Sequence, residues 1–306
     1  MAIPTSRTKE AAIVSIDTEE CDGCGQCVKV CSDFGLSIID NKATLSDNSV
    51  FGCVACGHCM MACPTGAIAV EGRTLAPLQL FDLPDKNSVP SYESLLAMLQ
   101  RRRSIRKFKE KPVEKEKIKL ILEAAQTAPM GLPPSDVHVV VFENKKQVRA
   151  FAEDFSGYLK SIRWMASGWF IKMMRPFWGK ANDEMMREFI KPVFDIYVDE
   201  MDKGDNWINY DAPLAMYFYG SPYSDPADPI IAATYAMLAG ESLGLGTCML
   251  GAVHPFIQSG KKARLFREKW GIKFKSREGL FVIFGYADVQ YKHGVKRTFA
   301  DIHHFS

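Results

Sequence analysis

Apolar positions in the last two thirds of the chain follow the periods of helices and strands. Leu95, Leu96 and Leu99 continue an i, i+3, i+4, i+7 stripe that starts at Tyr92, so a helix is expected there with Ser91 as its N-cap. Unbroken apolar runs rich in β-branched and aromatic residues instead predict buried strands. These runs are residues 137–142 and 280–285.

A second long helix is expected to begin at Asp228 and to stop near Gly244. Asp228 suits the N-cap, and Pro229 suits the first helical position, where its missing N–H costs nothing. The helix carries mostly small residues, which permit close packing against another element. A strand that ends near Gly251 is expected to follow it.

Residues 80–91 separate these elements from the first part of the chain. The segment contains two Pro, several polar residues and no sustained period, which is typical of a linker. We therefore expect an N-terminal domain over residues 1–78, a linker over residues 79–90 and a second domain over residues 91–306.

The middle of the second domain is rich in aromatic and Met side chains with basic residues among them. This pattern predicts amphipathic helices, and three interpretations of residues 155–210 stay open. The apolar side covers the second domain or a partner subunit, it forms a lid over a substrate, or it lies on a membrane surface. The membrane interpretation is the least favoured of the three.

Composition indicates a globular protein with one large and one small domain. The chain has 306 residues, of which 47% are apolar, and its 38 basic and 36 acidic residues give a net charge of +2. That charge is too small to predict binding to nucleic acid or to a membrane surface. The first residues lack an apolar signal segment, and Glu241 interrupts the most apolar later stretch, so we expect neither export nor a membrane span.

Eight of the nine cysteines fall in two short runs between residues 21 and 63. Each run reads C-x2-C-x2-C-x3-C, and the second repeats the first 32 residues later (53 − 21 = 32), which indicates an internal duplication. Tight runs of this kind suit metal rather than disulfides, and a reducing cytoplasm is the expected setting. The runs are Cys21, Cys24, Cys27 and Cys31, then Cys53, Cys56, Cys59 and Cys63.

This spacing predicts two 4Fe-4S clusters, because three thiolates of a run wrap one cluster while the fourth ligates the other. A pair of zinc knuckles also uses C-x2-C pairs, but it does not explain the third and fourth cysteines of each run. The expected ligand sets are Cys21, Cys24, Cys27 and Cys63 for the first cluster, and Cys31, Cys53, Cys56 and Cys59 for the second.

Residues 10–75 resemble a bacterial-type two-cluster ferredoxin. One departure from that pattern is Ser32, which stands where the family usually has Pro after the fourth cysteine of the run. His58 lies inside the second run, and we expect it to be a partly exposed loop residue rather than a ligand, because four thiolates already saturate the cluster.

A basic motif follows the first predicted helix. Arg102, Arg103, Ser104 and Arg106 place guanidinium forks and a hydroxyl within one turn, which suits a phosphate monoester, although arginines at a helix end also favour the helix dipole and solvent. The stretch RRSIRKF resembles the opening motif of the nitroreductase family of FMN-dependent enzymes. The resemblance implies that these four residues bind the flavin phosphate and the ribityl chain.

The resemblance to nitroreductases covers about residues 91–306 and implies an α+β domain with a mixed, mainly antiparallel sheet flanked by helices. It also implies a homodimer with FMN at the subunit interface. Pro133 stands near a position where many members have an Asn, so the flavin contact of that Asn is not carried over. The remaining FMN contacts that the resemblance implies are Pro129, Met130, Gly131, Met249, Leu250, Gly251, Lys296 and Arg297.

Two alternative chemistries are disfavoured near residue 248. The Gly244 and Gly246 pair is no dinucleotide-binding loop, because Met249 stands where a third Gly is required and the segment follows a helix instead of preceding one. Cys248 has apolar neighbours and no visible activating partner, so we expect a small buried side chain rather than a nucleophile.

These features predict an FMN-dependent oxidoreductase of anaerobic metabolism. Electrons from a low-potential donor, such as an external ferredoxin, pass through two 4Fe-4S clusters to FMN, which reduces an electron-poor small molecule such as a nitroaromatic. Two alternatives stay open: an adaptor that relays electrons to a protein partner, and a flavin reductase acting on quinone, ene or halogenated substrates. No catalytic acid is assigned.

Overall fold

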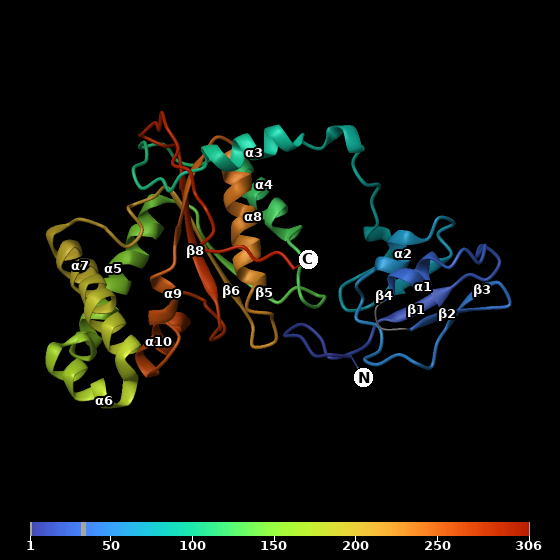
Figure 1. The fold of residues 1–306 in the computed structure, drawn as a ribbon, viewed down its shortest axis with the longest axis horizontal. Helices are drawn as coiled ribbons and strands as arrows, with labels where there is room; N and C mark the ends of the chain where they lie inside the picture. Colours follow the sequence, from blue (N-terminus) through green and yellow to red (C-terminus); the bar gives the residue numbers. More distant parts are fainter. Residues whose placement is uncertain (1, 32–34, 306) are drawn as a thin grey trace.

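The computed structural model describes residues 2–31 and 35–305, which form a small and a larger domain. Figure 1 shows the small domain in blue on one side of the larger domain, which runs from green to red. The predicted α+β class is confirmed, because both domains combine helices with antiparallel strand pairs. Ser32, the departure from the ferredoxin pattern, lies outside the described residues.

The small domain consists of two similar halves, each with a short helix that follows the first cysteines of a run. Its four strands form two antiparallel pairs, β1 with β4 and β2 with β3. The helices α1 and α2 pack against each other. The elements are β1 (Ile13–Ile16), α1 (Gln26–Val30), β2 (Leu36–Ile39), β3 (Lys42–Leu45), α2 (His58–Ala62) and β4 (Ile68–Glu71).

The duplication predicted from the cysteine runs recurs in the backbone. Gly25 and Gly57 precede the two helices in the left-handed region, with φ of 70° and 74°, and Cys31 and Cys63 follow the helices in extended conformation. Glycine adopts this φ without strain, so the chain can turn sharply between two cysteines of each run. Each helix has only five residues, too few to be stable alone, so its surroundings must hold it.

The larger domain is built on one antiparallel sheet with the strand order β5-β6-β8-β7. All seven residues of β6 and of β8 are buried, because these central strands have helices on both faces. The strand predicted at residues 137–142 and the one at 280–285 are therefore both confirmed. The strands are β5 (Val137–Phe142), β6 (Leu214–Gly220), β7 (Gly246–Leu250) and β8 (Gly279–Gly285).

Successive residues of β6 point to opposite faces of the sheet and so supply two separate cores. Tyr217 and Tyr219 belong to the core that contains Phe151 and Phe155, whereas Met216 and Phe218 belong to the core beneath the opposite helices. The first core lies under α5 (Lys145–Ile162), α9 (Val253–Phe256) and α10 (Lys261–Lys269), and the second lies under α4 (Lys115–Gln126) and α8 (Asp228–Ser242).

Two predicted helix starts have different outcomes. Ser91 caps α3 (Tyr92–Arg101) as predicted, since its side chain accepts the N–H of Ser94. Asp228 is the first residue of α8 and not its N-cap, which is Ala227. The Asp228 carboxylate instead accepts the N–H of Gly131 at 3.0 Å, so this side chain satisfies a distant loop rather than its own helix.

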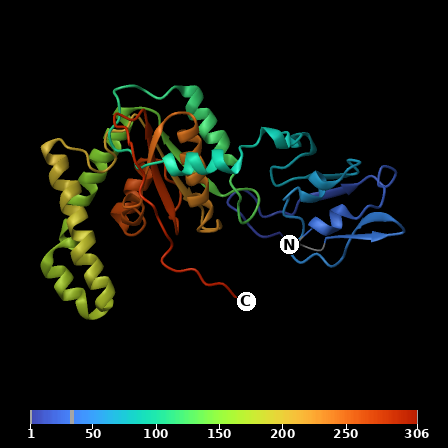
Figure 2. The same ribbon diagram turned by 45° about the horizontal axis from the view of Figure 1, so that its top comes forward.

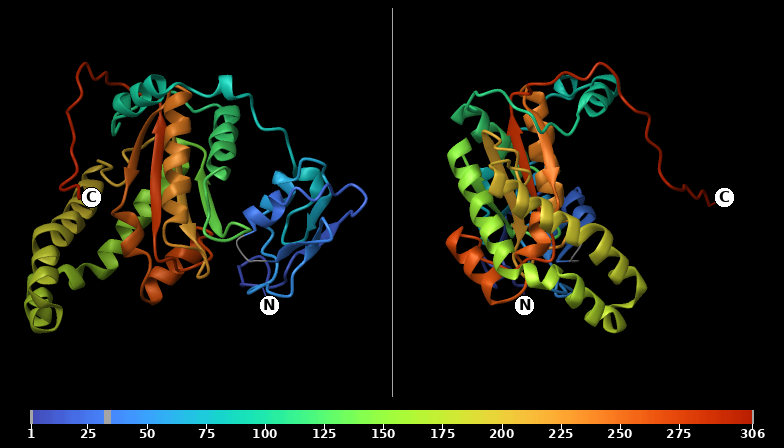
Figure 3. Two further views of the ribbon diagram at one scale, coloured as in Figure 1. Left: turned by 45° about the vertical axis from the view of Figure 1, so that its right-hand side comes forward. Right: turned by 90° about the vertical axis from the view of Figure 1, so that its left-hand side faces the viewer.

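Helix α3 and the C-terminal segment leave apolar side chains in solvent. No residue of α3 is buried, and Tyr92, Leu95 and Leu99 of its apolar stripe are exposed. Residues 288–305 contain no helix or strand, and Figure 3 shows this red C-terminal segment extending away from the sheet. Phe299 and Phe305 are among their exposed apolar residues.

The aromatic segment predicted at residues 155–210 is helical and lies at the end of the larger domain far from the small one (Figures 1 and 2). It consists of the end of α5, α6 (Gly168–Met185) and α7 (Lys191–Lys203), with a short 3-10 helix η3 (Arg163–Ala166) and a π-helical turn η4 (Met186–Ile190) between them. Phe155 is in the core, whereas Trp169 and Phe177 are exposed. Within the described residues, no helix is long and apolar enough to cross a bilayer.

Candidate functional site

A cavity in the small domain is lined by the four cysteines assigned to the second cluster. Its volume is about 320 Å³, and its walls also include apolar side chains such as Leu36 and Leu45. The four thiols surround this space rather than one point: within residues 2–31 and 35–305, no three His, Cys, Asp or Glu side chains converge on a single metal ion. The cysteines are Cys31, Cys53, Cys56 and Cys59.

The chemistry of these thiols fits a metal cluster. Burial, together with the nearby Cys53 and Cys56, raises the pKa of Cys59 to about 11, because adjacent thiolates repel each other. Such a set of thiolates is stable at neutral pH only when a cation balances it. Soft sulfur ligands around an apolar space suit iron–sulfur chemistry.

The ligands expected for the first cluster come from both halves of the small domain. Cys21 and Cys27 are buried and Cys24 is exposed. The Cys21 thiol accepts the N–H of Ala43 at 3.4 Å, and Cys63 follows α2, which packs on α1. His58, expected in a loop, is exposed but is the first residue of α2.

Cations from both ends of the larger domain line a second cavity, of about 790 Å³. Arg102 and Arg103 follow α3, whereas Lys296 and Arg297 belong to the C-terminal segment, almost two hundred residues later. The structure therefore brings together four of the residues expected to bind the flavin phosphate. Guanidinium groups in this number attract and bind a phosphate dianion.

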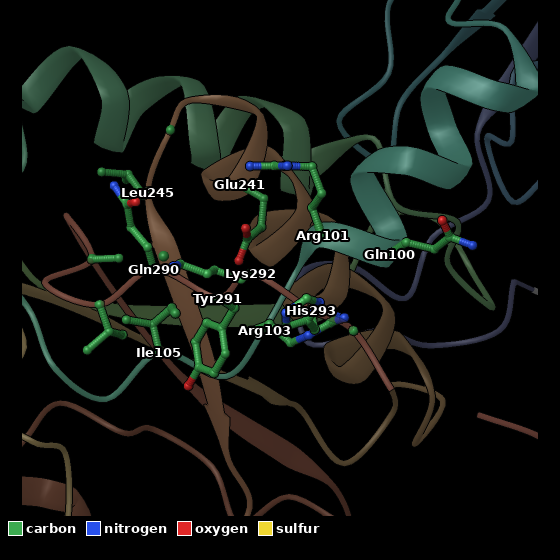
Figure 4. A pocket seen from close by; sticks show the side chains of 15 residues that line it. Gln100, Arg101, Arg103, Ile105, Glu241, Leu245, Gln290, Tyr291, Lys292 and His293 are labelled. Carbon is green, nitrogen blue, oxygen red and sulfur yellow. The ribbon is translucent and has the colours of Figure 1, made fainter. Parts of the chain in front are cut away.

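An adjoining cavity of about 510 Å³ shares Arg103 with this site and is shown in Figure 4. Lys292 is exposed but also lines this cavity, as does Glu241. Burial raises the pKa of Glu241, whose carboxylate accepts the Thr247 hydroxyl at 2.8 Å. Because Glu241 is also near Arg102, it is the acidic group that moderates the positive field here.

The edge strand β7 fixes the position of the arginine motif. The Ile105 N–H donates to the Thr247 carbonyl at 2.9 Å, and Ser104 pairs with Thr247 in a parallel bridge. Gly246 makes this approach possible, because a Cβ there would lie 2.6 Å from Cγ1 of Ile105. Arg106 points elsewhere, with its guanidinium carbon 5.7 Å from the centre of the Tyr210 ring.

The residues expected at the flavin ring lie at the end of the same strand. Met249 and Gly251 are exposed, while Leu250 is buried. Cys248 is fully buried, as predicted, and burial raises the pKa of its thiol. This thiol is therefore protonated and not a nucleophile at neutral pH.

The loop that contains Pro129, Met130 and Gly131 lies apart from the arginines. Pro129 and Met130 line a different cavity, of about 380 Å³, together with Arg7. Neither Arg102 nor Arg103 lines that cavity. A single chain thus holds the expected flavin residues in two separate groups.

Sequence analysis missed several residues that the structure brings to these sites. Glu241 and Tyr210 contact the arginine motif from distant parts of the chain. Arg73 is buried between the two domains, and Arg7 extends from the N-terminal segment to the loop before β5. None of them belongs to a periodic pattern or a motif, so the sequence held no signal for them.

Two family models match the chain. Residues 99–286 match the model of the nitroreductase family, and residues 13–64 match the model of a 4Fe-4S dicluster domain. This chain belongs to the nitroreductase family and carries a 4Fe-4S dicluster domain before the nitroreductase domain. Both resemblances stated from the sequence are confirmed.

Solved structures with a similar fold include bacterial nitroreductases. A nitroreductase with bound FMN from Bacteroides fragilis is 18% identical, with a TM-score of 0.49 over 69% of this chain and 98% of that one. A nitroreductase with bound FMN from Desulfitobacterium hafniense is 22% identical, with a TM-score of 0.47 over 67% and 97%. An FMN-dependent nitroreductase from Clostridium difficile is 22% identical, with a TM-score of 0.43 over 68% and 99%. No curated protein matches the chain.

Proposed function

We propose that this chain is an FMN-dependent oxidoreductase in which electrons pass from two 4Fe-4S clusters to FMN and then to an electron-poor small molecule such as a nitroaromatic. One observation carries the proposal: a single chain contains a thiol-lined cavity and, in its nitroreductase domain, a cavity lined by five cationic side chains. Bound FMN would accept electrons singly and release them in pairs, which is the chemistry that links a cluster to a hydride acceptor.

The residues around the cation-lined cavity are proposed to hold and orient FMN. Arg102, Arg103, Lys296 and Arg297 would bind its phosphate, and Ser104 would be positioned beside it by its bridge to β7. Arg106 is proposed to bind the ribityl chain, from a position where its guanidinium group also lies over the Tyr210 ring.

The end of β7 is proposed to face the flavin ring. Met249 and Gly251 are exposed there, and the missing side chain of Gly251 leaves open space within 4 Å. A ring could therefore approach the backbone N–H groups of Leu250 and Gly251 closely. Those N–H groups would donate to the ring and orient it for transfer to the acceptor.

A homodimer is proposed to complete this site. The loop residues Pro129, Met130 and Gly131 lie apart from the arginines, so the loop of a second copy would supply them. The exposed apolar stripe of α3 and the exposed Phe299 and Phe305 supply surface that a second copy would cover. We place the dimer in the cytoplasm, where reducing conditions keep cysteine ligands free of disulfides.

The domain limits are proposed as 1–78 for the two-cluster domain, 79–90 for the linker and 91–306 for the nitroreductase domain. The short turns η1 (Pro77–Gln79) and η2 (Lys86–Ser88) are compatible with such a connection. Residues 155–210 are proposed as a lid or dimer insertion, because Trp169 and Phe177 leave aromatic surface exposed for a flat substrate or a second chain.

The test is anaerobic reduction of the reconstituted protein, with iron, sulfide and FMN counted beforehand. A low-potential donor such as reduced ferredoxin should bleach the cluster absorbance first and the flavin absorbance next. A nitroaromatic should then reoxidise both, with two electrons consumed for each nitroso product. Quinones and halogenated compounds are tested in parallel to define the class of acceptor.

Two results would contradict the proposal in different ways. Bleaching of the flavin by NADH or NADPH before the clusters respond would show that electrons enter at the flavin and not at the clusters. Failure with every small acceptor, together with electron exchange with a protein partner, would support the adaptor alternative.

A further inference from the structure

Arg73 is a charged residue buried at the boundary between the two domains. Arg73 lies two residues after the end of β4, and only 6% of its surface is exposed. The guanidinium group donates only to backbone carbonyls, and among the described residues no carboxylate lies within ion-pair distance of it. A buried cation of this kind is costly unless its N–H groups find acceptors, and here four hydrogen bonds serve the five N–H groups of the guanidinium.

The four carbonyls that Arg73 binds come from three separate parts of the chain. Nε donates to Val54 at 3.2 Å, and Val54 follows Cys53 and lines the cavity of the second cluster. The terminal nitrogens donate to Glu10 at 2.8 Å and Ile3 at 3.2 Å, in the N-terminal segment. One of them also donates to Pro133 at 2.7 Å, in the larger domain. One side chain thus connects the wall of the second cavity to the nitroreductase domain.

The loop at the far end of this connection is the one expected to contact the flavin. Pro133 lies two residues after Gly131. Figure 3 shows this loop, in green between α4 and β5, reaching the small domain. Arg73 therefore links the segment that carries Cys53 to a loop with proposed flavin contacts.

The N-terminal segment reinforces the same boundary. The Ser6 N–H donates to the Asp136 carboxylate at 2.8 Å and 3.0 Å, and Asp136 is buried in the larger domain. Arg7 donates to the Ser135 carbonyl at 3.3 Å and to the Thr74 hydroxyl at 3.2 Å. The small domain is thus held in place by contacts beyond the linker.

Comparison of the two duplicated halves of the small domain shows that only the second half carries an arginine at the position of Arg73. The position that corresponds to Arg73 in the first half is Asn41 (73 − 41 = 32), and both residues adopt a left-handed conformation, with φ of 49° and 57°. Asn tolerates that conformation readily, whereas a long side chain there is uncommon. Asn41 is exposed, in the turn between β2 and β3.

The first cluster site lies beside that opposite turn. Lys42 donates to the Cys21 carbonyl at 2.6 Å, and Ala43 donates to the Cys21 thiol. In Figure 1 the β2–β3 pair is the part of the small domain farthest from the larger domain. Leu36 and Leu45 of that pair also line the second cavity, so the two sites are neighbours within the small domain. They differ in their link to the larger domain: Arg73 joins Val54 of the second site to Pro133, whereas among the described residues no hydrogen bond joins a cysteine of the first site to the larger domain.

We propose that Arg73 is a positioning residue that docks the second cluster site against the flavin domain, so that electrons enter at the first cluster and leave from the second. This proposal rests on the proposed function. With both cofactors bound, each two-electron reduction of FMN would take one electron from each cluster and protons from solvent, and the low-potential donor would replace both electrons. The positive charge beside Cys53 also favours the reduced form of the second cluster, because it stabilises added negative charge.

The experiment compares three variants of the full-length protein with both cofactors counted. Arg73→Asn removes the guanidinium group and keeps a residue that suits the left-handed backbone, as Asn41 does. Arg73→Lys keeps the charge but cannot bind four carbonyls in a fixed fork. Lys42→Gln is the matched control, because it removes a cation beside the first cluster and touches no part of the larger domain.

The rate of flavin reduction by prereduced clusters should fall at least tenfold in Arg73→Asn, while iron and FMN contents stay as in the wild type. Hydrogen exchange in residues 129–136 and protease cleavage in residues 79–90 should increase in the same variant. Arg73→Lys should show the increased exchange with a cluster potential closer to that of the wild type. Lys42→Gln should leave exchange and cleavage unchanged.

Unchanged exchange and an unchanged flavin-reduction rate in Arg73→Asn would overturn the inference while leaving the proposed function intact. Absence of FMN or of clusters from the wild type would instead overturn the proposed function. The exchange measurement would then still report whether Arg73 docks the two domains.

Discussion

The two domains of this protein are stabilised in different ways. The larger domain buries complete aromatic side chains, such as Phe151, Phe155 and Phe281, against a sheet covered on both faces. The small domain has a core in which thiols such as Cys21 and Cys59 stand among a few aliphatic residues, beside a cavity. Burial of apolar side chains is therefore sufficient to stabilise the larger domain, whereas the small domain also requires bonds between its thiolates and metal.

Removal of the clusters should have the largest effect, because it should unfold the small domain and leave the larger domain folded. Anaerobic treatment with an oxidant and an iron chelator should leave residues 13–71 without hydrogen-exchange protection, because two five-residue helices and a cavity cannot hold the domain. Exchange in the larger domain should stay slow, since its core contains no metal ligand. A protected small domain in the metal-free protein would contradict this account.

Loss of an arginine at the cation-lined cavity should have the next largest effect. Arg103→Ala should weaken FMN binding about 10–100-fold, because a charge-assisted hydrogen bond contributes about 1.5–3 kcal/mol. Fluorescence titration of the apoprotein with FMN measures this change. Lys119→Ala, at an exposed position of α4, is the matched control and should bind FMN as the wild type does. Equal losses in both variants would show a general effect of charge.

The packing of the arginine motif on β7 should be sensitive to one methyl group. Gly246→Ala should destabilise the larger domain by about 1–3 kcal/mol, because the new Cβ would lie 2.6 Å from Ile105. Denaturant unfolding measures the loss. Gly251→Ala is the control for stability, since nothing lies within 4 Å of its Cβ. A second change, Ile105→Ala, should recover part of the loss, so the two effects should not add.

Mild acid should have the smallest effect, which is a loss of stability of the larger domain. Burial lowers the pKa of His254, whose Nδ1 lies 2.8 Å from the Tyr217 hydroxyl, and burial also lowers the pKa of His138. Below the usual histidine pKa of about 6.5 the unfolded chain binds more protons than the folded one, so stability is lost as pH falls. Each histidine contributes a slope of at most about 1.4 kcal/mol per pH unit.

Unfolding midpoints of the larger domain at pH 7.5 and pH 5.5 measure this dependence. His254→Gln should reduce the slope but not abolish it, because His138 titrates in the same direction. A slope that is the same in the variant and the wild type would show that His254 is not its source.

Local features of the fold were predictable because each depends on neighbours in sequence. The Ser91 cap, the strands at 137–142 and 280–285 and the small-residue helix all follow from short-range patterns. Helix α8 begins at Asp228 as predicted, but the predicted N-cap role of Asp228 was wrong, because its carboxylate accepts the N–H of the distant Gly131 rather than one of its own helix. A pattern of capping residues carries no information about such a partner.

The sequence by itself determined which side chains are candidates for this chemistry: the cysteine spacing indicates a duplicated 4Fe-4S domain and predicts its cluster ligands, and the arginine motif predicts an anion site. Only the tertiary structure decided where these groups meet. It brought Arg103 beside Arg297, separated both from Met130, and placed Arg73, but not its counterpart Asn41, between the domains. The physical reason is that ligands are fixed by side-chain type and spacing, whereas domain contacts depend on backbone carbonyls that every residue carries alike.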